Sequence, residues 1–272
     1  GSWKINFPSI YNLFKNLIIK IFGDQFFKSI QYHYWYYKIK NEKYFESDLK
    51  LVKKILSPGD IVFDIGAHFG RYAIPCSRIV GQQGKIFAFE PIESTYKILY
   101  KITVKLKLKN IEFFNCALSD CQNTQQIVIP VNKNGIEMQS CSFLTNNIDL
   151  INDINDYHIQ EVTVETVDNL IKGFDLKSLK LIKCDVEGAE LFVIKGTMNT
   201  IKKYSPIILL EIVRHHTKRF NYYPNDLIQF MKKLDYKMYI FSNGKLVEKL
   251  KSTSNNVNYF FVPNRTDITK LV

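Results

Sequence analysis

Phe63-Asp64-Ile65-Gly66-Ala67-His68-Phe69-Gly70 is the stretch of this sequence that decides the fold. The apolar run 61–65 is typical of a strand buried in a parallel sheet. Gly66 then lets the chain turn sharply and bring its backbone close to a ligand, and Gly70 lets the following helix pack closely. Because ligands of open α/β sheets bind outside the carboxyl ends of the strands, this loop predicts a binding site.

Outward from this loop, apolar strand patterns alternate with helical patterns along the chain. This alternation predicts a doubly wound α/β fold, in which helices cover both faces of a mostly parallel sheet. A hairpin over 237–248 and 257–263, turning at Asn243-Gly244, adds an antiparallel edge. We expect the polar stretch 132–159 to be the most mobile segment. The expected strands are 61–65, 85–90, 111–117, 126–131, 160–167, 179–184 and 206–212, and the expected helices are 9–22, 46–56, one ending near Val80, about 93–108, about 188–203 and 224–234.

Two domains are expected: a helical, aromatic-rich extension over residues 3–44 and an α/β domain over residues 45–265. Residues 9–22 show helical periodicity, and an aromatic cluster follows. Residues 9–37 could contact a membrane surface peripherally, or they could pack on the main domain or on a second copy in a homo-oligomer. We favour packing, because an amphipathic face does not itself say what covers it. The aromatic cluster consists of Tyr32, Tyr34, Trp35, Tyr36 and Tyr37.

Composition narrows the class of protein. The 272 residues carry 37 Lys and Arg against 26 Asp and Glu, a net charge of +11. Such a charge can attract anionic partners, but the chain has no dense Lys/Arg block, so we favour a solvated basic surface and expect no nucleic-acid partner. The five cysteines form no CxxC pair, which indicates reduced thiols. No apolar run approaches the about 18 residues that span a bilayer. We expect a cytoplasmic protein, with peripheral membrane contact left open.

Glu90-Pro91 ends the second expected strand, twenty residues after Gly70. An acidic side chain at this place can accept hydrogen bonds from both hydroxyls of a ribose. A glycine loop followed by such an acid therefore predicts a site for an adenosine-containing cofactor.

The glycine spacing discriminates between adenosine cofactors. A dinucleotide fingerprint would need glycines where this chain has His68 and Arg71, so a pyrophosphate would meet side chains and a nicotinamide cofactor is disfavoured. The spacing Asp64-x-Gly66-x-x-x-Gly70 suits S-adenosylmethionine, which has no phosphate. Its ammonium group needs acceptors, and Asp64 and the loop carbonyls can serve.

The block Lys183-Cys184-Asp185-Val186-Glu187-Gly188-Ala189-Glu190 follows another buried strand. Asp185 and Glu187 are candidates to orient a substrate hydroxyl, to accept its proton or to hold a divalent cation. If a metal is bound, Asp185 is the expected ligand. Acidic residues also stabilise the first turn of a helix, and we assign that role to Glu190.

Glu211-Ile212-Val213-Arg214-His215-His216 ends the next strand at the same edge. Glu211 and His215 are therefore further catalytic candidates. Histidine is the natural general base near neutral pH. A surface or structural role for His215 stays open.

The chain resembles the FkbM-type methyltransferases over residues 45–213. The resemblance implies a seven-stranded class I methyltransferase sheet, use of S-adenosylmethionine, and O-methylation of sugars, polyketides or related metabolites. Two departures are His68, where the family usually has Asn, and Gln122-Asn123-Thr124, where it usually has a Gly. The resemblance rests on Phe63-Asp64-Ile65-Gly66-Ala67, Phe89-Glu90-Pro91, Ala117-Leu118-Ser119-Asp120, Val164-Glu165-Thr166-Val167-Asp168-Asn169-Leu170, Leu181-Ile182-Lys183-Cys184-Asp185-Val186-Glu187-Gly188-Ala189-Glu190 and Pro206-Ile207-Ile208-Leu209-Leu210-Glu211.

By matching position, the resemblance implies that Leu118 and Ser119 lie near the adenine and that Asp185 faces the reaction centre. The expected acceptor is a hydroxyl of a sugar, glycan or small metabolite. The full set of expected cofactor-binding residues is Asp64, Gly66, Ala67, His68, Gly70, Glu90, Pro91, Leu118 and Ser119.

Three other functions are alternatives for this sequence. Methylation of a nucleic-acid amino group usually needs an Asn/Asp-Pro-Pro-aromatic block, and this chain has Asp185-Val186-Glu187-Gly188 in that place. A catalytically silent cofactor-fold module, anchoring an assembly through residues 3–40, is an alternative from another class. A nicotinamide-dependent oxidoreductase is the third.

Overall fold

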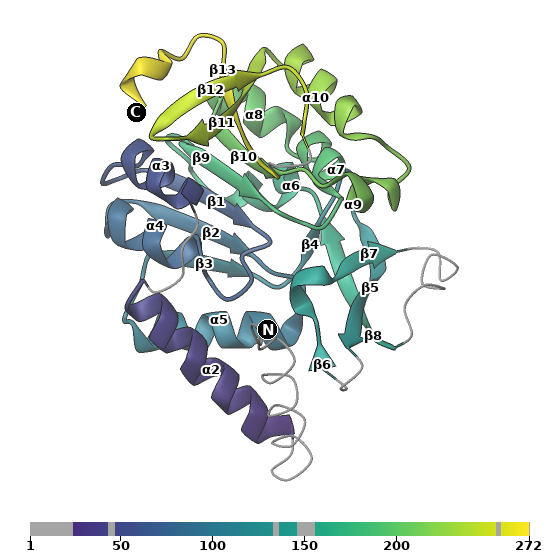
Figure 1. Ribbon diagram of the computed structural model, residues 1–272. Coiled ribbons are helices and arrows are strands. Elements are labelled where there is room, and N and C mark those ends of the chain that lie inside the picture. Colours follow the sequence, from purple (N-terminus) through teal and green to yellow (C-terminus); the bar gives the residue numbers. More distant parts are fainter. Residues whose placement is uncertain (1–23, 43–46, 133–135, 146–155, 254–256, 272) are drawn as a thin grey trace, which may run out of the picture.

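The computed structural model describes residues 24–42, 47–132, 136–145, 156–253 and 257–271 (Figure 1). Its centre is an eight-stranded sheet in the order β12-β11-β13-β10-β9-β1-β2-β3. The strands are β1 Ile61–Ile65, β2 Lys85–Phe89, β3 Ile111–Phe114, β9 Leu181–Cys184, β10 Ile207–Glu211, β11 Tyr236–Ser242, β12 Lys245–Lys249 and β13 Asn258–Pro263.

The sheet confirms the expected doubly wound arrangement but has eight strands rather than seven. β3, β2, β1, β9 and β10 are parallel neighbours, and β13 pairs antiparallel with both β10 and β11. β11 and β12 form the expected hairpin, in which Asn243 and Gly244 have positive φ angles of 50° and 77°. This pair is typical of a two-residue hairpin turn. The C-terminal strand therefore inserts into the sheet, and β12 becomes the additional edge strand.

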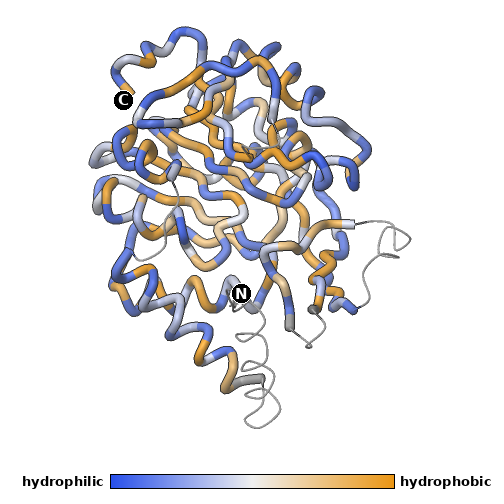
Figure 2. Tube along the Cα trace, viewed as in Figure 1, coloured by the Kyte–Doolittle hydropathy of each residue, from blue (hydrophilic) through white to orange (hydrophobic). Residues whose placement is uncertain are grey.

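Helices cover both faces of this sheet because successive strand residues point to opposite sides. In β1, Val62 packs in a core cluster with helices α3, α4 and α5, whereas Phe63 packs in a second cluster with α7, α8 and α10. Figure 2 shows hydrophobic residues concentrated along the central strands. The helices are α3 Ser47–Ile55, α4 Ala73–Val80, α5 Glu93–Lys105, α6 Val167–Leu170, α7 Glu190–Lys195, α8 Met198–Tyr204, α9 Arg214–Lys218 and α10 Pro224–Lys233, with 3₁₀ turns η3 Ile171–Gly173 and η4 Ile268–Lys270.

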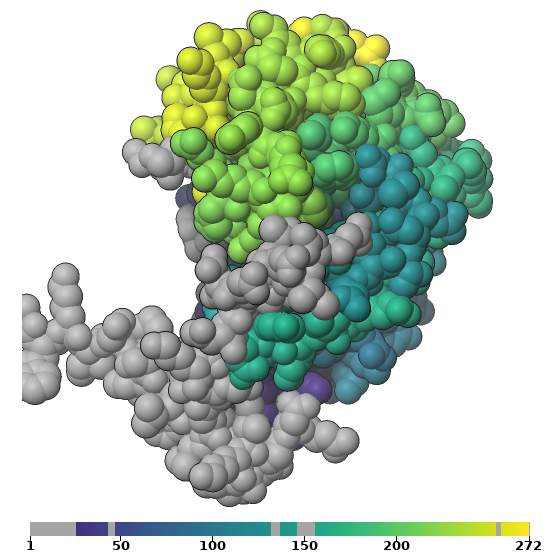
Figure 3. Space-filling view, turned by 90° about the vertical axis from the view of Figure 1, so that its right-hand side faces the viewer, coloured from purple at the N-terminus to yellow at the C-terminus, as the bar shows by residue number. Residues whose placement is uncertain are grey.

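A second sheet was only partly anticipated. The expected strand 111–117 breaks after β3, where the Asn115 side-chain amide donates hydrogen bonds to the backbone carbonyls of Glu90 and Pro91 at 2.8 and 3.1 Å. The chain then enters a sheet ordered β4-β8-β5-β6, with β7 paired to β5. Figure 3 faces this side of the molecule, with the second sheet below the C-terminal elements. Its elements are β4 Ala117–Leu118, β5 Asn123–Asn132, β6 Ile136–Glu137, the 3₁₀ turn η1 Gln139–Cys141, β7 Phe143–Thr145 and β8 Tyr157–Glu165.

Two local expectations are corrected. The polar stretch 132–159 was expected to be the most mobile segment, and no strand was predicted within it, but residues 136–145 form β6, η1 and β7, while 133–135 and 146–155 lie outside the described residues. The expected helix 188–203 is split into α7 and α8. An added Cβ on Gly196, at the break, would lie 1.9 Å from the Ser119 carbonyl oxygen, so the chain packs there against the start of the second sheet.

Helix α2, Asp24–Lys40, packs on the main sheet domain. Ile39 is buried, and the Trp35 ring lies 4.8 Å from the Phe69 ring and 6.0 Å from the His68 ring, centroid to centroid. The expected helix 9–22 lies outside the described residues. Within the described residues, no helix is long and apolar enough to cross a membrane. The side chains of α2 that stay exposed include Phe26, Ile30, Tyr34 and Tyr37.

Candidate active site

A cavity opens at the carboxyl ends of β1, β2 and β9, the edge where a ligand of an open α/β sheet is expected. The glycine loop after β1 forms one wall and the turn after β9 forms another. The second sheet supplies the opposite wall, which consists of Ile127, Gln139, Ser140, Ser142, Phe143 and Leu144.

The glycine loop is shaped by a close contact with the strand beside it. Gly66 has a φ of 73°, and an added Cβ would lie 1.9 Å from the backbone carbonyl oxygen of Asp185. His68 also has a positive φ, 49°. Histidine and asparagine are both enriched in this backbone region, so His68 can stand where the family usually has Asn. The loop is therefore preformed by backbone geometry.

Glu90 is buried and held by two backbone donors. The amide of His68 donates to its Oε2 at 2.8 Å, and the amide of Ile92 donates to its Oε1 at 3.0 Å. Burial raises the pKa of Glu90 to about 7, although both hydrogen bonds oppose this rise. A carboxylate has about four lone-pair sites, so two remain for the hydroxyls of a ribose.

Lys183 connects the cofactor loop to the catalytic candidates. Its Nζ donates a hydrogen bond of 2.9 Å to the Gly66 carbonyl and lies 3.7 Å from an Asp64 oxygen and 3.5 Å from an Asp185 oxygen. Burial lowers the pKa of Lys183, but the attraction of Asp185 and Asp64 outweighs burial and raises it. Asp64 in turn accepts a hydrogen bond of 2.7 Å from the amide of Ala73, at the start of α4.

Three acidic side chains gather beyond Lys183. Burial opposes the ionisation of Asp185, but the Lys183 ammonium and a hydrogen bond with Glu211 lower its pKa overall. Burial, followed by the charge of Asp185, raises the pKa of Glu187 to about 8 and that of Glu211 to about 9. Asp185 is thus the member of the group that is ionised near neutral pH.

The two adjacent histidines lie in different surroundings. His216 is partly buried, and its Nδ1 lies 3.1 Å from a Glu187 oxygen. Burial lowers the pKa of His216 to about 4. His215 is exposed and lines a separate pocket with Tyr223 and Pro224. The structure therefore brings His216, and not the expected His215, to the acidic group.

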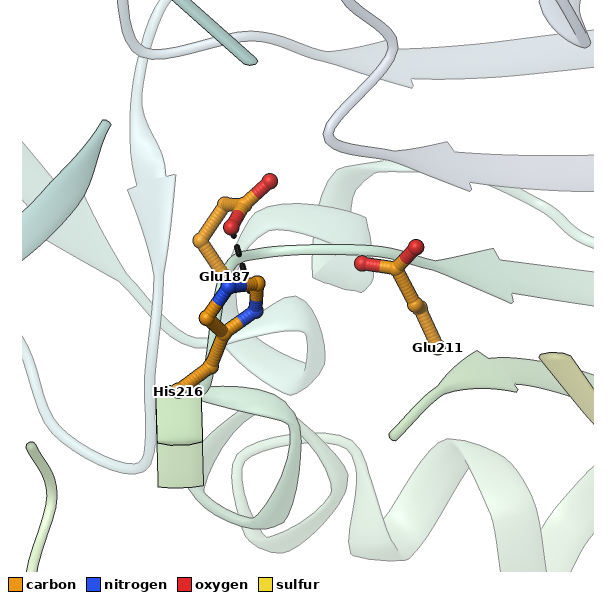
Figure 4. A group of neighbouring side chains, drawn as sticks. All are labelled: Glu187, Glu211 and His216. Carbon is orange, nitrogen blue, oxygen red and sulfur yellow. Dashed lines mark ion pairs between the residues drawn. The ribbon is translucent and has the colours of Figure 1, made fainter. Parts of the chain in front are cut away.

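Glu187, Glu211 and His216 each offer a ligand atom, and these atoms all lie within 4.8 Å of one another (Figure 4). Asp185, the ligand expected from the sequence, is not in this group. The candidate metal site therefore consists of these three residues, which lie in the turn after β9, at the end of β10 and in α9.

Most of the expected site residues do meet at one cavity, but several lie outside its wall. Glu211 lines a neighbouring pocket that Asp185 and Lys183 share. Asp64, Gly70 and Ser119 do not line the cavity. Gly70 packs against the helix α5 instead, since an added Cβ would lie 2.7 Å from the Leu99 side chain. The expected residues that line the cavity are Gly66, Ala67, His68, Glu90, Pro91, Leu118, Asp185 and Glu187.

Sequence reasoning missed several residues of the site. A lysine inside the apolar strand 181–184 was a visible signal, because lysine is almost never fully buried without a partner. Arg71 and Tyr72 line the cavity from the turn before α4. Residues 139–144 had no periodic signal and reach the cavity through the pairing of β7 with β5.

Comparisons with known proteins identify the family of this chain. The family model of the methyltransferase FkbM domain matches residues 64–238, more than half of the chain. The hexuronic acid methyltransferase AglP of Haloferax volcanii is 23% identical over 163 residues, which cover 59% of this chain and 59% of that protein. This chain thus matches about three fifths of the length of that relative.

Two solved structures are also similar to this chain. A methyltransferase FkbM from Methylobacillus flagellatus KT is 15% identical, with a TM-score of 0.47 over 76% of this chain and 44% of that one. A SAM-dependent O-methyltransferase from Thermotoga maritima is 12% identical, with a TM-score of 0.41 over 86% of this chain and 72% of that one. Both TM-scores are below 0.5, so the family assignment rests on the match over residues 64–238. On that match, the chain belongs to the FkbM methyltransferase family.

Proposed function

We propose that this chain transfers a methyl group from S-adenosylmethionine to a hydroxyl of a sugar or small metabolite. The observation that carries this proposal is the placement of Glu90, Asp185 and Glu187 on one cavity. A carboxyl group placed to bind the ribose and an ionised carboxylate, Asp185, placed to accept a proton at the same sheet edge are what such a transfer needs.

The residues around the cavity fit the cofactor. Glu90 is fixed by the amides of His68 and Ile92 and keeps lone pairs for the ribose. Leu118 and Pro91 offer apolar surface for the adenine. The Gly66 carbonyl already accepts from Lys183, so its remaining lone pair is available to an ammonium group. S-adenosylmethionine supplies an electrophilic methyl group when it is bound.

The acceptor oxygen forms a bond to the methyl carbon as the carbon–sulfur bond breaks, and the hydroxyl loses its proton. We assign the proton to Asp185, because it is the carboxylate of this group that is ionised near neutral pH and its side chain is 35% exposed. Lys183 and Glu211 hold this carboxylate in place. Alignment of the acceptor can itself supply up to about 7–11 kcal/mol of the rate enhancement.

We propose an acidic sugar as the first acceptor to test. AglP, the relative from Haloferax volcanii, is a hexuronic acid methyltransferase. In this chain the Arg219 guanidinium lies 4.2 Å from the centroid of Phe143, which lines the cavity. Among the described residues, Arg219 Nη1 is buried without a hydrogen-bond partner. A guanidinium is well suited to bind a carboxylate, so Arg219 can recognise a uronate.

Family membership favours this function over the alternatives. The FkbM domain is a methyltransferase domain, which decides against a nicotinamide-dependent oxidoreductase. A catalytically silent module would bind the cofactor but methylate no acceptor. Methylation of a nucleic-acid amino group usually needs an Asn/Asp-Pro-Pro-aromatic block, and this chain has Asp185-Val186-Glu187-Gly188 in that place.

Two measurements test the proposal. Isothermal titration should show binding of S-adenosylmethionine and no appreciable binding of NADH. Transfer of a labelled methyl group should then be detected with glucuronic or galacturonic acid, and Arg219→Met should reduce transfer to these acids more than transfer to neutral sugars. Tight NADH binding without S-adenosylmethionine binding contradicts the proposal. Cofactor binding without transfer to any acceptor in a broad hydroxyl panel favours the silent module.

Peripheral membrane contact through residues 9–37 stays a prediction. Its support within the described residues is the exposed apolar stripe Phe26, Ile30, Tyr34 and Tyr37 on α2, at helical spacing. We expect Tyr34→Ser combined with Tyr37→Ser to reduce flotation with anionic liposomes. If the wild type and the double variant float equally, or neither floats, the prediction of membrane contact is wrong.

Homo-oligomer formation also stays a prediction, which light scattering of the purified chain tests.

A further inference from the structure

Glu187, Glu211 and His216 converge from three parts of the chain. Glu187 lies in the turn after β9, Glu211 ends β10, and His216 lies in α9. Their carboxylate oxygens and imidazole nitrogen all lie within 4.8 Å of one another (Figure 4). Both Glu187 and His216 are mostly buried, with side chains 17% and 16% exposed.

The spacing of one pair of these atoms fits a coordination sphere. Two ligand atoms at right angles, each about 2.1 Å from one ion, lie about 3.0 Å apart. His216 Nδ1 and Glu187 Oε2 are 3.1 Å apart. One imidazole and two carboxylates form a mixed donor set that suits divalent first-row transition metals such as Mn²⁺, Co²⁺ or Zn²⁺.

Backbone packing, rather than the side chains themselves, holds two of the ligands together. An added Cβ on Gly188 would lie 2.5 Å from the backbone oxygen of His216, so the turn that carries Glu187 lies directly against α9. The Tyr222 hydroxyl donates a hydrogen bond of 2.7 Å to the Gly188 carbonyl from the other side. The distance between Glu187 and His216 is therefore built into the fold.

The group also lies beside the reaction edge. Glu187 lines the same cavity as Asp185, and Asp185 is hydrogen-bonded to Glu211. An ion held here would be next to the carboxylate that we assign to proton removal. It could bind the acceptor hydroxyl and lower its pKa, as metal ions do for bound water.

We propose that Glu187, Glu211 and His216 bind a divalent metal ion on the acceptor side of the active site. Binding of the ion follows from the geometry of the three ligands. Its role in orienting and activating the acceptor hydroxyl rests on the proposed methyl transfer.

Binding of Mn²⁺ to the metal-free protein, followed by electron paramagnetic resonance, tests the site without any turnover. We expect one Mn²⁺ per chain in the wild type and an affinity at least about tenfold weaker in His216→Ala and in Glu211→Gln. His215→Ala is the matched control, because His215 is the neighbouring histidine but lies outside the group. It should bind Mn²⁺ like the wild type. Thermal melts verify that each variant folds. If His216→Ala does not fold, the Mn²⁺ affinity of Glu211→Gln is compared with that of the wild type.

The outcomes separate this inference from the proposed function. Absence of both Mn²⁺ and Co²⁺ binding in the wild type overturns the metal site, and so does wild-type affinity in both ligand variants. Full methyl transfer by the chelator-treated enzyme overturns the role of the ion in activating the acceptor. Stoichiometric Mn²⁺ binding with no transfer to any acceptor leaves the metal site standing and counts against the proposed function.

Discussion

The ammonium nitrogen of Lys183 lies 2.9 Å from the carbonyl oxygen of Gly66 and donates a hydrogen bond to it. The same nitrogen lies within 4 Å of the carboxylates of Asp64 and Asp185. One buried cation thus joins the glycine loop, β1 and the turn after β9. Because a buried charge needs compensation, each of these three parts depends on the others.

Lys183→Met should destabilise the protein by about 3 kcal/mol, since it leaves two carboxylates without their shared cation. Removal of one partner from a buried ion pair usually costs about 3–5 kcal/mol, and we expect the lower end because Asp185 is partly exposed. Chemical denaturation measures this change. Lys54→Met, on the exposed side of α3, should stay within about 0.5 kcal/mol of the wild type. Equal stability of the two variants would show that Lys183 is not compensating the carboxylates.

Glu90→Ala should weaken S-adenosylmethionine binding by about 1.5–3 kcal/mol, because the ribose loses its charged acceptor. The pKa of Glu90 in the unliganded protein is about 7, so the ionised form gains population as the pH rises through 7. Wild-type affinity should therefore rise about tenfold between pH 6 and pH 8 and then level off. Titration calorimetry across this range should show that rise in the wild type and in the exposed control Glu93→Gln. If the affinity of Glu90→Ala for S-adenosylmethionine still rises between pH 6 and pH 8, the pH dependence belongs to another group.

Asp185→Asn should lower the methyl-transfer rate by roughly 10²–10⁴, the range for a positioned acid–base group. The substitution keeps the shape of the side chain and removes its charge, so cofactor affinity should change little. Single-turnover rates and cofactor titrations, measured on one preparation, check both statements. Asp175→Asn, at an exposed position, is the control. Near-wild-type turnover in Asp185→Asn would remove the catalytic assignment and leave the cofactor site standing.

Gly188→Ala should destabilise the protein by at least about 2 kcal/mol, because the residue has a φ of 114° and its new Cβ would meet the His216 backbone oxygen at 2.5 Å. Displacement of α9 should also weaken Mn²⁺ binding. The control is Gly173→Ala, where an added Cβ meets no atom within 4 Å, and the expected change is below about 0.5 kcal/mol. Similar melting curves for the two variants would refute the close packing of the turn on α9.

Trp35→Ala should destabilise the protein by about 2 kcal/mol, since its half-buried ring packs on Phe69 and His68. Hydrogen exchange of the amides in residues 66–70 should become faster, because the loop loses the contact with α2. Tyr37→Ala, whose ring is 53% exposed on the same helix, should leave that exchange unchanged. Unchanged exchange in Trp35→Ala would mean that α2 does not support the cofactor loop.

The order of the central elements could be predicted because it depends on local pattern. The run before Gly66 and the acid at position 90 each lie at a strand end, and parallel strands bring their carboxyl ends to one edge. The predicted hairpin at Asn243-Gly244 likewise depends on two residues with positive φ. The eighth strand is β12, which pairs with β11 across this turn, whereas the predicted strand 257–263 is β13. The position of β13 between β10 and β11 could not be predicted from local pattern, because it is a long-range pairing.

The choice between the two adjacent histidines could not be made from the sequence. Successive residues of a helix point about 100° apart, so only one of His215 and His216 can face a given neighbour. The packing of Gly188 against α9 decides that this residue is His216. The wall formed by residues 139–144 was missed for a related reason, since β7 reaches the cavity only by pairing with β5.

Short-range patterns and strand direction were enough to predict the class of fold, the sheet edge at which the cavity opens and the presence of Glu90 and Asp185 at that edge. The tertiary structure decided which partners those acids meet. Lys183 becomes a shared cation, Gly66 must be glycine because Asp185 approaches it, and His216 joins Glu187 and Glu211. These relationships depend on contacts between residues far apart in the chain, and distances across a packed core are set by how whole elements pack rather than by their local sequence.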